Sequence, residues 1–405
     1  MSKRKRSEEI VAKSALMARD RERPRGGAGE RRPGGASTPF LLGRAGVVDG
    51  SSGAAVPAKR PDARRRSLAA LLATTTAVMS ALAPAPVLAN DSTAELTTGG
   101  LVFAKSASVE MRAEDLFVSD KEIRVRYRFF NAAPRDVTSL VAFPMPDIVY
   151  DGPDDSLAIP SEDPANFLDF QTNADGRPVA AELEQKALAN GVDQTARLKA
   201  LGVPLAPQLE QTDKALDALT PAQKAELANL KMTAPNDYDV GKGMEHHLTA
   251  AWTLKSTYFW RQTFPAGREI VIEHRYRPSV GETTGTQLGS PDLEKDALAR
   301  YETTYCVDQD FLSAARQAMG KPDQTGLLSS PFFERRIAYI LTTGANWAGP
   351  INDFHLVVDK GAADSLVSFC AEGVNKISAT QFEVRHANFT PSRELHVLIL
   401  YRPRL

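Results

Sequence analysis

The sequence feature that most constrains the fold lies between Lys121 and Asp147, where apolar and basic side chains alternate strictly. The apolar members are Ile123, Val125, Tyr127 and Phe129, and the basic members are Arg124, Arg126 and Arg128. Because successive side chains of a β-strand point to opposite faces, this period of two places the apolar set on one sheet face and the arginines on the other. The pattern predicts a half-buried strand with one hydrated face.

A turn and a second strand follow directly. Residues 131–136 contain asparagine, proline and aspartate, which are residue types that form turns. The apolar run from Val137 to Phe143 ends before Pro144 and Pro146, because proline cannot donate a hydrogen bond to a sheet ladder. We therefore predict an antiparallel hairpin that begins a β-sandwich.

The first 89 residues differ in composition from the rest of the chain. Residues 1–66 are rich in arginine, glycine, serine and proline, which predicts a disordered basic leader; a start codon assigned too far upstream would account for it. In residues 67–89, the apolar run Leu68–Leu82 follows Arg64–Arg66, and the small-residue site Val87–Ala89 comes after two prolines. A basic segment, an apolar run and a small-x-small site are typical of a secretory signal peptide.

This interpretation predicts cleavage after Ala89, with Asn90 as the first mature residue, and a periplasmic or secreted location. The apolar run is short compared with the about 20 residues that cross a bilayer. We therefore expect no membrane span after cleavage. An uncleaved N-terminal anchor is the alternative.

Removal of the leader changes the charge of the chain. The whole sequence has a net charge of −1, whereas residues 90–405 contain 32 lysines and arginines against 43 aspartates and glutamates, a net charge of −11. An acidic mature chain argues against nucleic acid and against anionic membrane surfaces as partners.

The chain contains two cysteines, Cys306 and Cys370. An even count in an exported chain favours a disulfide bond. A loop of this length would stabilise the fold by roughly 4 kcal/mol in the chain-entropy model. Two buried free thiols are the alternative.

Residues 90–290 are predicted to form an N-terminal β-sandwich. Val109, Met111, Leu116 and Val118 alternate around an acidic turn at Glu114–Asp115, and aromatic-rich residues 249–264 and their partner strand 268–278 form a second predicted hairpin. A helical insert is expected at 181–231, with a first helix at 181–189 and a last helix that starts at a Thr220–Gln223 capping box. The insert is either a cover over the end of a sheet or a lobe that docks a partner.

Residues 291–405 are predicted to form a C-terminal immunoglobulin-like β domain that begins with two helices. Short strands are expected at 336–343, 354–359, 366–370, 381–386 and 395–401, separated by glycine, proline and asparagine. The predicted fold class is therefore mainly β with inserted helices, arranged as two β-sandwich-like domains.

The most distinctive loop candidate is Thr342–Pro350, which combines glycine, asparagine, tryptophan and proline after a strand. Rigid sandwiches often carry function on such loops, so Thr342, Asn346 and Trp347 form a candidate binding loop. The alternative is a structural turn in which Trp347 closes the end of the sandwich.

Common catalytic and metal-binding motifs are missing from the sequence, which contains no GxSxG, GxxxxGK[ST], HExxH or CxxC pattern. Carboxylates cluster at 147–163, but without the spacing of an EF-hand. Glu245, His246 and His247 form a polar loop, and adjacent histidines in an extended segment point to opposite faces. We therefore assign no catalytic, cofactor or metal residue and expect no cofactor.

Several distinctive segments follow one another along the chain: NDSTAELTTGGLVF after the signal peptide, VRYRFFN, VTSLVAFPMPDI, YILTTGANWAGPI and SFCAEGV. Together they resemble the domain of unknown function 4424 family of exported proteins from Gram-negative bacteria. The resemblance covers Asn90 to Arg402. It implies a periplasmic or secreted location and no particular activity.

The first predicted domain is also similar to the vault-protein and inter-alpha-trypsin domain through FPMPD, DFQTNADGRPV and FPAGREIVIEHRYRP. That resemblance implies a β-sandwich. No DxSxS metal site follows, so it does not imply adhesion chemistry.

These patterns favour a non-enzymatic envelope protein that binds another protein, a glycan or the cell wall. The alternative is a periplasmic hydrolase or metal-dependent enzyme that uses Glu245, His246, His274 or the acidic loop. Convergence of these side chains in one deep pocket would favour the enzyme.

Overall fold

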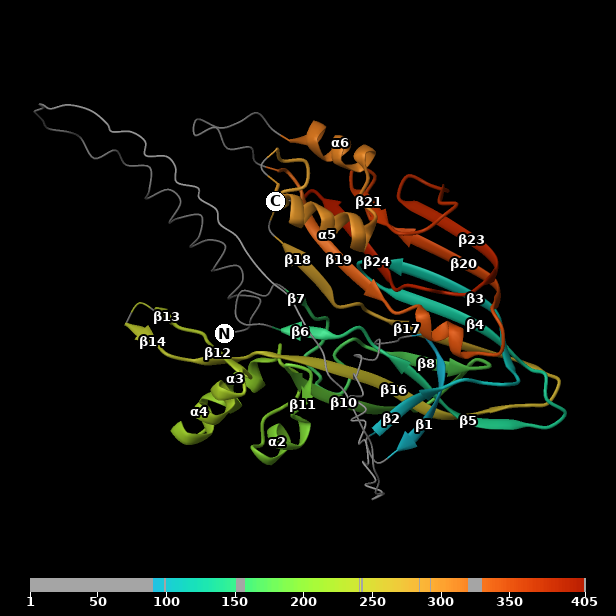
Figure 1. Ribbon diagram of the computed structural model, residues 1–405, viewed down its shortest axis with the longest axis horizontal. Coiled ribbons are helices and arrows are strands. Elements are labelled where there is room, and N and C mark those ends of the chain that lie inside the picture. Colours follow the sequence, from blue (N-terminus) through green and yellow to red (C-terminus); the bar gives the residue numbers. More distant parts are fainter. Residues whose placement is uncertain are drawn as a thin grey trace, which may run out of the picture. The chain divides into compact units, whose positions relative to one another are not determined.

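The computed structural model describes residues 90–97, 100–150, 157–239, 241, 243–283, 285–291, 293–319 and 330–403. The predicted leader and signal peptide lie outside these residues. The described chain is mainly β, as the sequence predicts, with three large sheets and a small number of helices (Figure 1). No helix in this part of the chain is both long and apolar enough to span a membrane.

The eight-stranded sheet, in the order β22-β23-β20-β3-β4-β17-β8-β9, forms one layer of the fold. Its strands are β3 (Val109–Ser119), β4 (Ile123–Asn131), β8 (Gln171–Ala174), β9 (Arg177–Pro178), β17 (Glu269–Tyr276), β20 (Ile351–Asp359), β22 (Asn375–Lys376) and β23 (Gln381–Phe389).

The seven-stranded sheet, in the order β11-β10-β16-β5-β1-β2 with β6 also paired to β16, packs against it. Its strands are β1 (Ser92–Thr97), β2 (Gly100–Ala104), β5 (Val137–Pro144), β6 (Ile148–Tyr150), β10 (Glu182–Ala189), β11 (Val192–Asp193) and β16 (Trp252–Phe264).

The third sheet has the order β21-β24-β19-β18-β7. Its strands are β7 (Leu157–Ala158), β18 (Val280–Thr283), β19 (Phe333–Tyr339), β21 (Leu366–Phe369) and β24 (Leu395–Tyr401). Two small two-stranded sheets pair β12 (Thr233–Pro235) with β15 (Leu248–Ala250) and β13 (Tyr238–Asp239) with β14 (Met244–Glu245).

The helices gather at two places in Figure 1. α5 (Lys295–Tyr305) and α6 (Gln309–Ala318) contact β21 and β24, whereas α2 (Thr195–Ala200), α3 (Glu210–Asp217) and α4 (Pro221–Asn229) lie near β10, β12 and β15. The predicted capping box at the start of α4 is present, since Thr220 and Gln223 cap each other's backbone.

The strand predicted from strict alternation is confirmed in β4. Ile123, Val125, Tyr127 and Phe129 are all buried, while Arg124 and Arg126 lie on the opposite face. The buried set packs into a core shared with the seven-stranded sheet; for example, the ring centroids of Phe129 and Phe264 are 5.8 Å apart.

The two predicted hairpins are wrong, because each pair of strands divides between two sheets. β4 pairs with β3 and β17, whereas β5 pairs with β1 and β16. β16 and β17, which a turn connects, are divided in the same way: β16 belongs to the seven-stranded sheet and β17 to the eight-stranded sheet. Both strands of each pair have an apolar face, and these faces meet across the sandwich instead of lying side by side in one sheet.

Asn131 connects the two segments in which the chain crosses from one sheet to the other, between β4 and β5 and between β16 and β17. Its fully buried side chain donates hydrogen bonds to the carbonyls of Arg135 (2.9 Å) and Phe264 (2.8 Å). Its own carbonyl accepts from Gly267 N at 2.9 Å, within the second crossing. The two crossings are therefore neighbours at one end of the sandwich.

The helix predicted at 181–189 is wrong, since these residues form β10. This segment pairs with β16 from Glu182↔Phe259 to Leu188↔Thr253. Its alanine, leucine and glutamate content favours helix, but pairing with a long strand overrides that propensity. Asn190 and Gly191, with φ of 50° and 77°, form the tight turn from β10 to β11.

The structure also differs from the predicted division near residue 290. β20 pairs in parallel with β3, and β18 pairs with β19, so strands from both predicted domains share two sheets. The described residues belong to one compact unit. The five strands predicted in 291–405 are present as β19, β20, β21, β23 and β24, but they do not form a separate sandwich.

A disulfide joins Cys306 and Cys370, as the cysteine count predicts. Cys306 follows α5 and Cys370 follows β21, so the bond ties a helix to the edge of the third sheet. Asp308 caps α6 as predicted, since its carboxylate accepts a hydrogen bond from Phe311 N at 2.8 Å.

Candidate functional site

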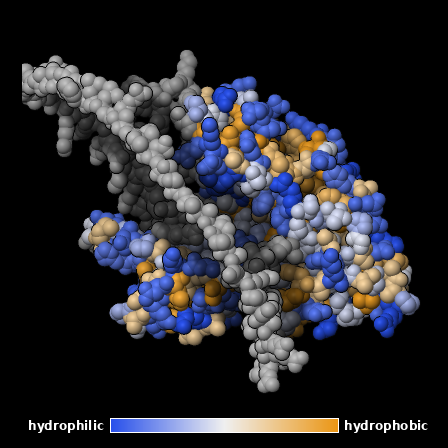
Figure 2. All heavy atoms as spheres, viewed as in Figure 1, coloured by the Kyte–Doolittle hydropathy of each residue, from blue (hydrophilic) through white to orange (hydrophobic). Residues whose placement is uncertain are grey.

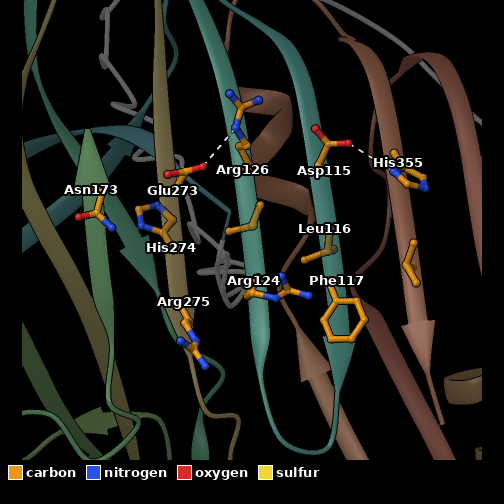
Figure 3. A pocket seen from close by; sticks show the side chains of 12 residues that line it. Asp115, Leu116, Phe117, Arg124, Arg126, Asn173, Glu273, His274, Arg275 and His355 are labelled. Atoms are coloured by element: carbon orange, nitrogen blue, oxygen red, sulfur yellow. Dashed lines mark hydrogen bonds and ion pairs between the residues drawn. The ribbon is translucent and has the colours of Figure 1, made fainter. Parts of the chain in front are cut away.

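An open depression with a volume of about 400 Å³ crosses the outer face of the eight-stranded sheet (Figure 3). Strands β8, β17, β4, β3 and β20 all contribute to it, so its lining combines residues from both ends of the chain. The lining residues are Asp115, Leu116, Phe117, Arg124, Val125, Arg126, Asn173, Glu273, His274, Arg275, His355 and Val357.

Ion pairs cover the middle of this outer face. Arg126 Nε lies 3.2 Å from Glu273 Oε1 across the β4–β17 pair. A dashed line marks this ion pair in Figure 3. Glu122 binds two arginines at once, Arg124 at 2.9 Å and Arg275 at 2.7 Å. The alternation of β4 therefore produces a charged ladder on the outside of the sheet.

His355 lies between two carboxylates at one side of the depression. Its Nδ1 is 3.3 Å from Asp115 Oδ1, and its Nε2 is 3.4 Å from Glu383 Oε2. The lining residues include no serine, threonine or cysteine. This arrangement can bind a polar or charged group, but it does not place a nucleophile beside a base.

A buried polar cluster lies on the inner side of the same sheet; its members are Asn90, Asp91, Glu114, Tyr127, His274 and Tyr339. Asp91 Oδ1 and His274 Nε2 are 3.0 Å apart, and both side chains are fully buried. Aromatic rings enclose the imidazole, with the centroid of Phe143 at 4.6 Å. Burial raises the pKa of Asp91, and the neighbouring His274 opposes that rise.

Glu114 is the second buried carboxylate of the cluster. It accepts hydrogen bonds from Asn90 Nδ2 at 2.9 Å and from the Tyr339 hydroxyl at 3.4 Å. The hydroxyls of Tyr127 and Tyr339 are 2.9 Å apart. Burial raises the pKa of Glu114 to about 8, and the two hydrogen bonds only partly offset this rise.

The candidate binding loop holds the start of the described chain. Thr342–Asn346 forms a 3-10 helix, η1, and Trp347 is buried with its ring centroid 4.3 Å from that of Phe129. Trp347 Nε1 donates to Asp91 O at 2.5 Å, and Asn346 Nδ2 donates to Ser92 Oγ at 3.0 Å. These contacts correspond to the structural alternative, in which the tryptophan closes the end of the sandwich.

Thr342 has a different role in that loop. Its hydroxyl donates to Glu394 Oε1 at 2.6 Å, and the same carboxylate accepts from Leu341 N at 2.6 Å. Thr342 thus ties the loop to the segment before β24.

The residues of the predicted enzymatic alternative lie in different surroundings. His246 lies 3.2 Å from Asp237, beside the exposed β13–β14 hairpin that contains Glu245, whereas His274 is enclosed in the core. His247 Nδ1 lies 2.6 Å from Asp217 of α3, and hydrogen bonds to Asp217 and Glu245 raise the pKa of His247. The structure therefore does not bring these groups into one pocket.

The acidic segment 147–163 is described only in part, since residues 151–156 lie outside the described chain. Asp147 lies 2.9 Å from Lys255 Nζ, and burial raises its pKa. Among the residues that the structure describes, no three His, Cys, Asp or Glu side chains are grouped as metal ligands would be.

Sequence reasoning missed Asp91 and Glu114. The predicted acidic turn at Glu114–Asp115 is wrong, because both residues lie inside β3, where a bulge shifts the register between Met111 and Ala113. A change of parity in the apolar positions, from 109 and 111 to 116 and 118, was a signal for this bulge. No sequence signal identified Asp91 as buried.

The chain belongs to the family described as "Domain of unknown function (DUF4424)", whose model matches residues 89–398. No curated protein matches the chain. Among solved structures, the chain is similar to a candidate nutrient binding protein from Legionella pneumophila, with 14% identity and a TM-score of 0.36 over 77% of this chain and 70% of that one.

Proposed function

We propose that this protein is an exported, non-enzymatic binding protein of the cell envelope, which binds a partner protein through the outer face of the eight-stranded sheet. The observation that carries the proposal is the open depression in that face, with its ladder of paired charges. The signal-peptide pattern of residues 67–89 supports export.

The charges favour a partner of mixed charge. Arg126 and Glu273 keep 46% and 43% of their side-chain surface exposed, so a partner could contact both without breaking their ion pair. Surface ion pairs contribute little to folding, typically about 0–1 kcal/mol. They do favour specific and fast association with a surface of complementary charge.

A protein fits this face better than a glycan does. Sugars commonly stack on exposed aromatic rings, and the aromatic residue of the lining is Phe117. The guanidinium of Arg124 lies 4.6 Å from the centre of that ring and covers it. On the face of the molecule that Figure 2 shows, hydrophilic and hydrophobic residues are interspersed.

Capture of a partner from an envelope extract by immobilised residues 90–405 tests this proposal. We expect Arg126→Glu to reduce capture by about tenfold or more, as charge reversal at a binding face does. Lys214→Glu is the matched control, because it makes the same charge change on α3, where the lysine side chain is 73% exposed. We expect capture to weaken as salt rises.

Two outcomes would contradict the proposal. Equal capture by Arg126→Glu and Lys214→Glu would show that the outer face is not the binding surface. Capture that persists after the extract is digested with a protease would indicate a glycan or cell-wall ligand.

A further inference from the structure

The first described residues lie inside the protein. Asn90, Asp91 and Ser92 are all fully buried, and the Thr342–Trp347 loop contacts each of them. Asn90 N donates to Thr343 Oγ1, while Asp91 O and Ser92 Oγ accept from Trp347 and Asn346. Asn90 is also the residue at which the sequence predicts the mature chain to begin.

The buried polar cluster contains more acidic than basic groups. Asp91 and Glu114 are both fully buried, and His274 is the basic member of the cluster. Asp91 Oδ2 is buried without a hydrogen-bond partner among the described residues. A buried ionised carboxylate without a cation destabilises a fold, so ionisation of both carboxyl groups calls for a second cation in the cluster.

We propose that cleavage of the Ala89–Asn90 bond supplies this charge, and that the new α-ammonium of Asn90 is the buried counter-ion of Asp91 and Glu114. The inference rests on the export part of the proposed function. In the hydrolysis, the Ala89–Asn90 C–N bond breaks, and water gives its hydroxyl to the Ala89 carbonyl carbon and its proton to Asn90 N. The proton released by the new Ala89 carboxyl group converts the amine to an ammonium.

Both carboxylates of the cluster are close to Asn90, Asp91 in the chain and Glu114 in space. A peptide amide has one N–H donor, which Thr343 Oγ1 accepts, whereas an ammonium has three. Asp91 Oδ2 belongs to the next residue, and Glu114 Oε2 lies 2.9 Å from Nδ2 of the same asparagine. The ammonium would add a second basic group to the cluster, beside the imidazole of His274.

The burial of Asn90 also orders the events of maturation. A protease needs access to the bond that it cleaves, and Asn90 N lies inside the folded protein. Cleavage therefore precedes folding, and the fold then encloses the new N-terminus. The Thr342–Trp347 loop acts as the binding site for this end of the chain.

Two versions of the protein test the proposal in solution. Removal of a ubiquitin-like fusion by its protease leaves a chain that starts either at Asn90 or, one residue earlier, at Ala89. The urea unfolding curve and the rate of α-amine acylation are measured for each. We expect the folding equilibrium constant of the Asn90 chain to be larger by about tenfold or more, the size of a charge-assisted hydrogen bond.

The α-amine gives a second, independent result. We expect the amine of the Asn90 chain to react at least about tenfold more slowly in the native state than in urea, because closed states protect buried groups. Glu114→Gln should reduce the difference in stability between the two chains. Glu95→Gln is the control, since it makes the same substitution at an exposed position of β1.

Equal unfolding midpoints for the two chains, or an amine of the Asn90 chain that reacts at its urea rate in native protein, would overturn the proposal. So would N-terminal sequencing of the exported protein that finds another first residue. If the Ala89 chain does not fold, the acylation rate of the α-amine in the native Asn90 chain still tests the proposal. None of these measurements involves a binding partner, so they can succeed even if the outer face of the sheet binds no protein.

Discussion

Glu273 and His274 are neighbours on β17, yet each forms an ion pair in a different environment. Glu273 pairs with Arg126 on the outer face, where both side chains keep more than two fifths of their surface exposed. His274 pairs with Asp91 on the inner face, where both side chains are fully buried. One strand thus carries an exposed charge ladder on one side and a buried polar cluster on the other.

The difference teaches that the same type of contact serves two purposes. An exposed pair is solvated whether or not its partner is present, so its loss hardly changes stability. A buried pair has lost its water, so removal of one partner leaves a charge that nothing compensates. We infer that the inner face determines stability and that the outer face is available for binding.

The largest expected effect comes from His274→Ala. In a chain that starts before Asn90, we expect the free energy of unfolding to fall by about 3–5 kcal/mol, because the substitution leaves Asp91 as a buried, unpaired carboxylate. Urea denaturation measures this change. Glu273→Ala, one residue away, is the control and should cost less than about 1 kcal/mol; equal losses would contradict the distinction between the faces.

A pH effect at Glu114 follows next in size. In a chain that starts before Asn90, the pKa of Glu114 is raised by burial from 4.5 to about 8. The folded state therefore holds its proton more tightly than the unfolded state. The contribution of Glu114 to stability is therefore greatest below pH 4.5 and is lost, on the order of a few kcal/mol, as pH rises through about 8.

Urea midpoints measured across this pH range check that prediction. Glu114→Gln should remove the decline. Among the other titratable groups, Asp91 and Asp115 act on Glu114 through their charges, and Tyr339 acts through its hydrogen bond. The chain that starts at Asn90 should show a smaller decline, because a buried ammonium favours the ionised carboxylate. A decline of the same size in the Glu114→Gln variant would contradict the assignment.

Gly344→Ala tests how closely the loop holds the N-terminal segment. A Cβ at this position would lie 2.7 Å from Asn90 Nδ2 and 3.2 Å from Ile351 Cδ1. We expect a loss of about 1–3 kcal/mol from overpacking, measured by thermal or urea unfolding. Gly285→Ala, where no atom lies within 4 Å, is the matched control; equal stability of the two variants would show that Asn90 is not tightly held.

The smallest effect on stability is expected at the outer face. Removal of both partners of the Arg126–Glu273 pair should change the free energy of unfolding by no more than about 1 kcal/mol. A double-mutant cycle in urea measures the coupling between the two residues. A coupling as large as that between Asp91 and His274 would mean that the outer face also stabilises the fold.

The sequence predicted local structure better than pairing. Alternation in 123–129 correctly assigned the buried and exposed sides of β4, since a period of two depends on the strand alone. It could not show that β4 and β5 lie in different sheets, because a hairpin and a crossing between sheets both bring apolar faces to the core. The helix expected at 181–189 failed for a related reason, as β10 depends on pairing with β16.

The site was harder to predict than the fold. Trp347 was identified as a residue of interest, and its burial against Phe129 agrees with one of its two predicted roles. Asp91 and Glu114 were not identified, because carboxylates are normally exposed and only tertiary partners such as His274 and Asn90 make their burial possible. The outer depression combines strands that are distant in sequence, so no local motif marks it.

Exchange of the outer ion pair tests the division between the two faces most directly. The double variant Arg126→Glu with Glu273→Arg keeps an ion pair on the β4–β17 ladder but reverses its direction. We predict an unfolding midpoint within about 1 kcal/mol of the natural protein, together with loss of partner capture from an envelope extract. Unchanged stability with undiminished capture would contradict the claim that the outer face binds.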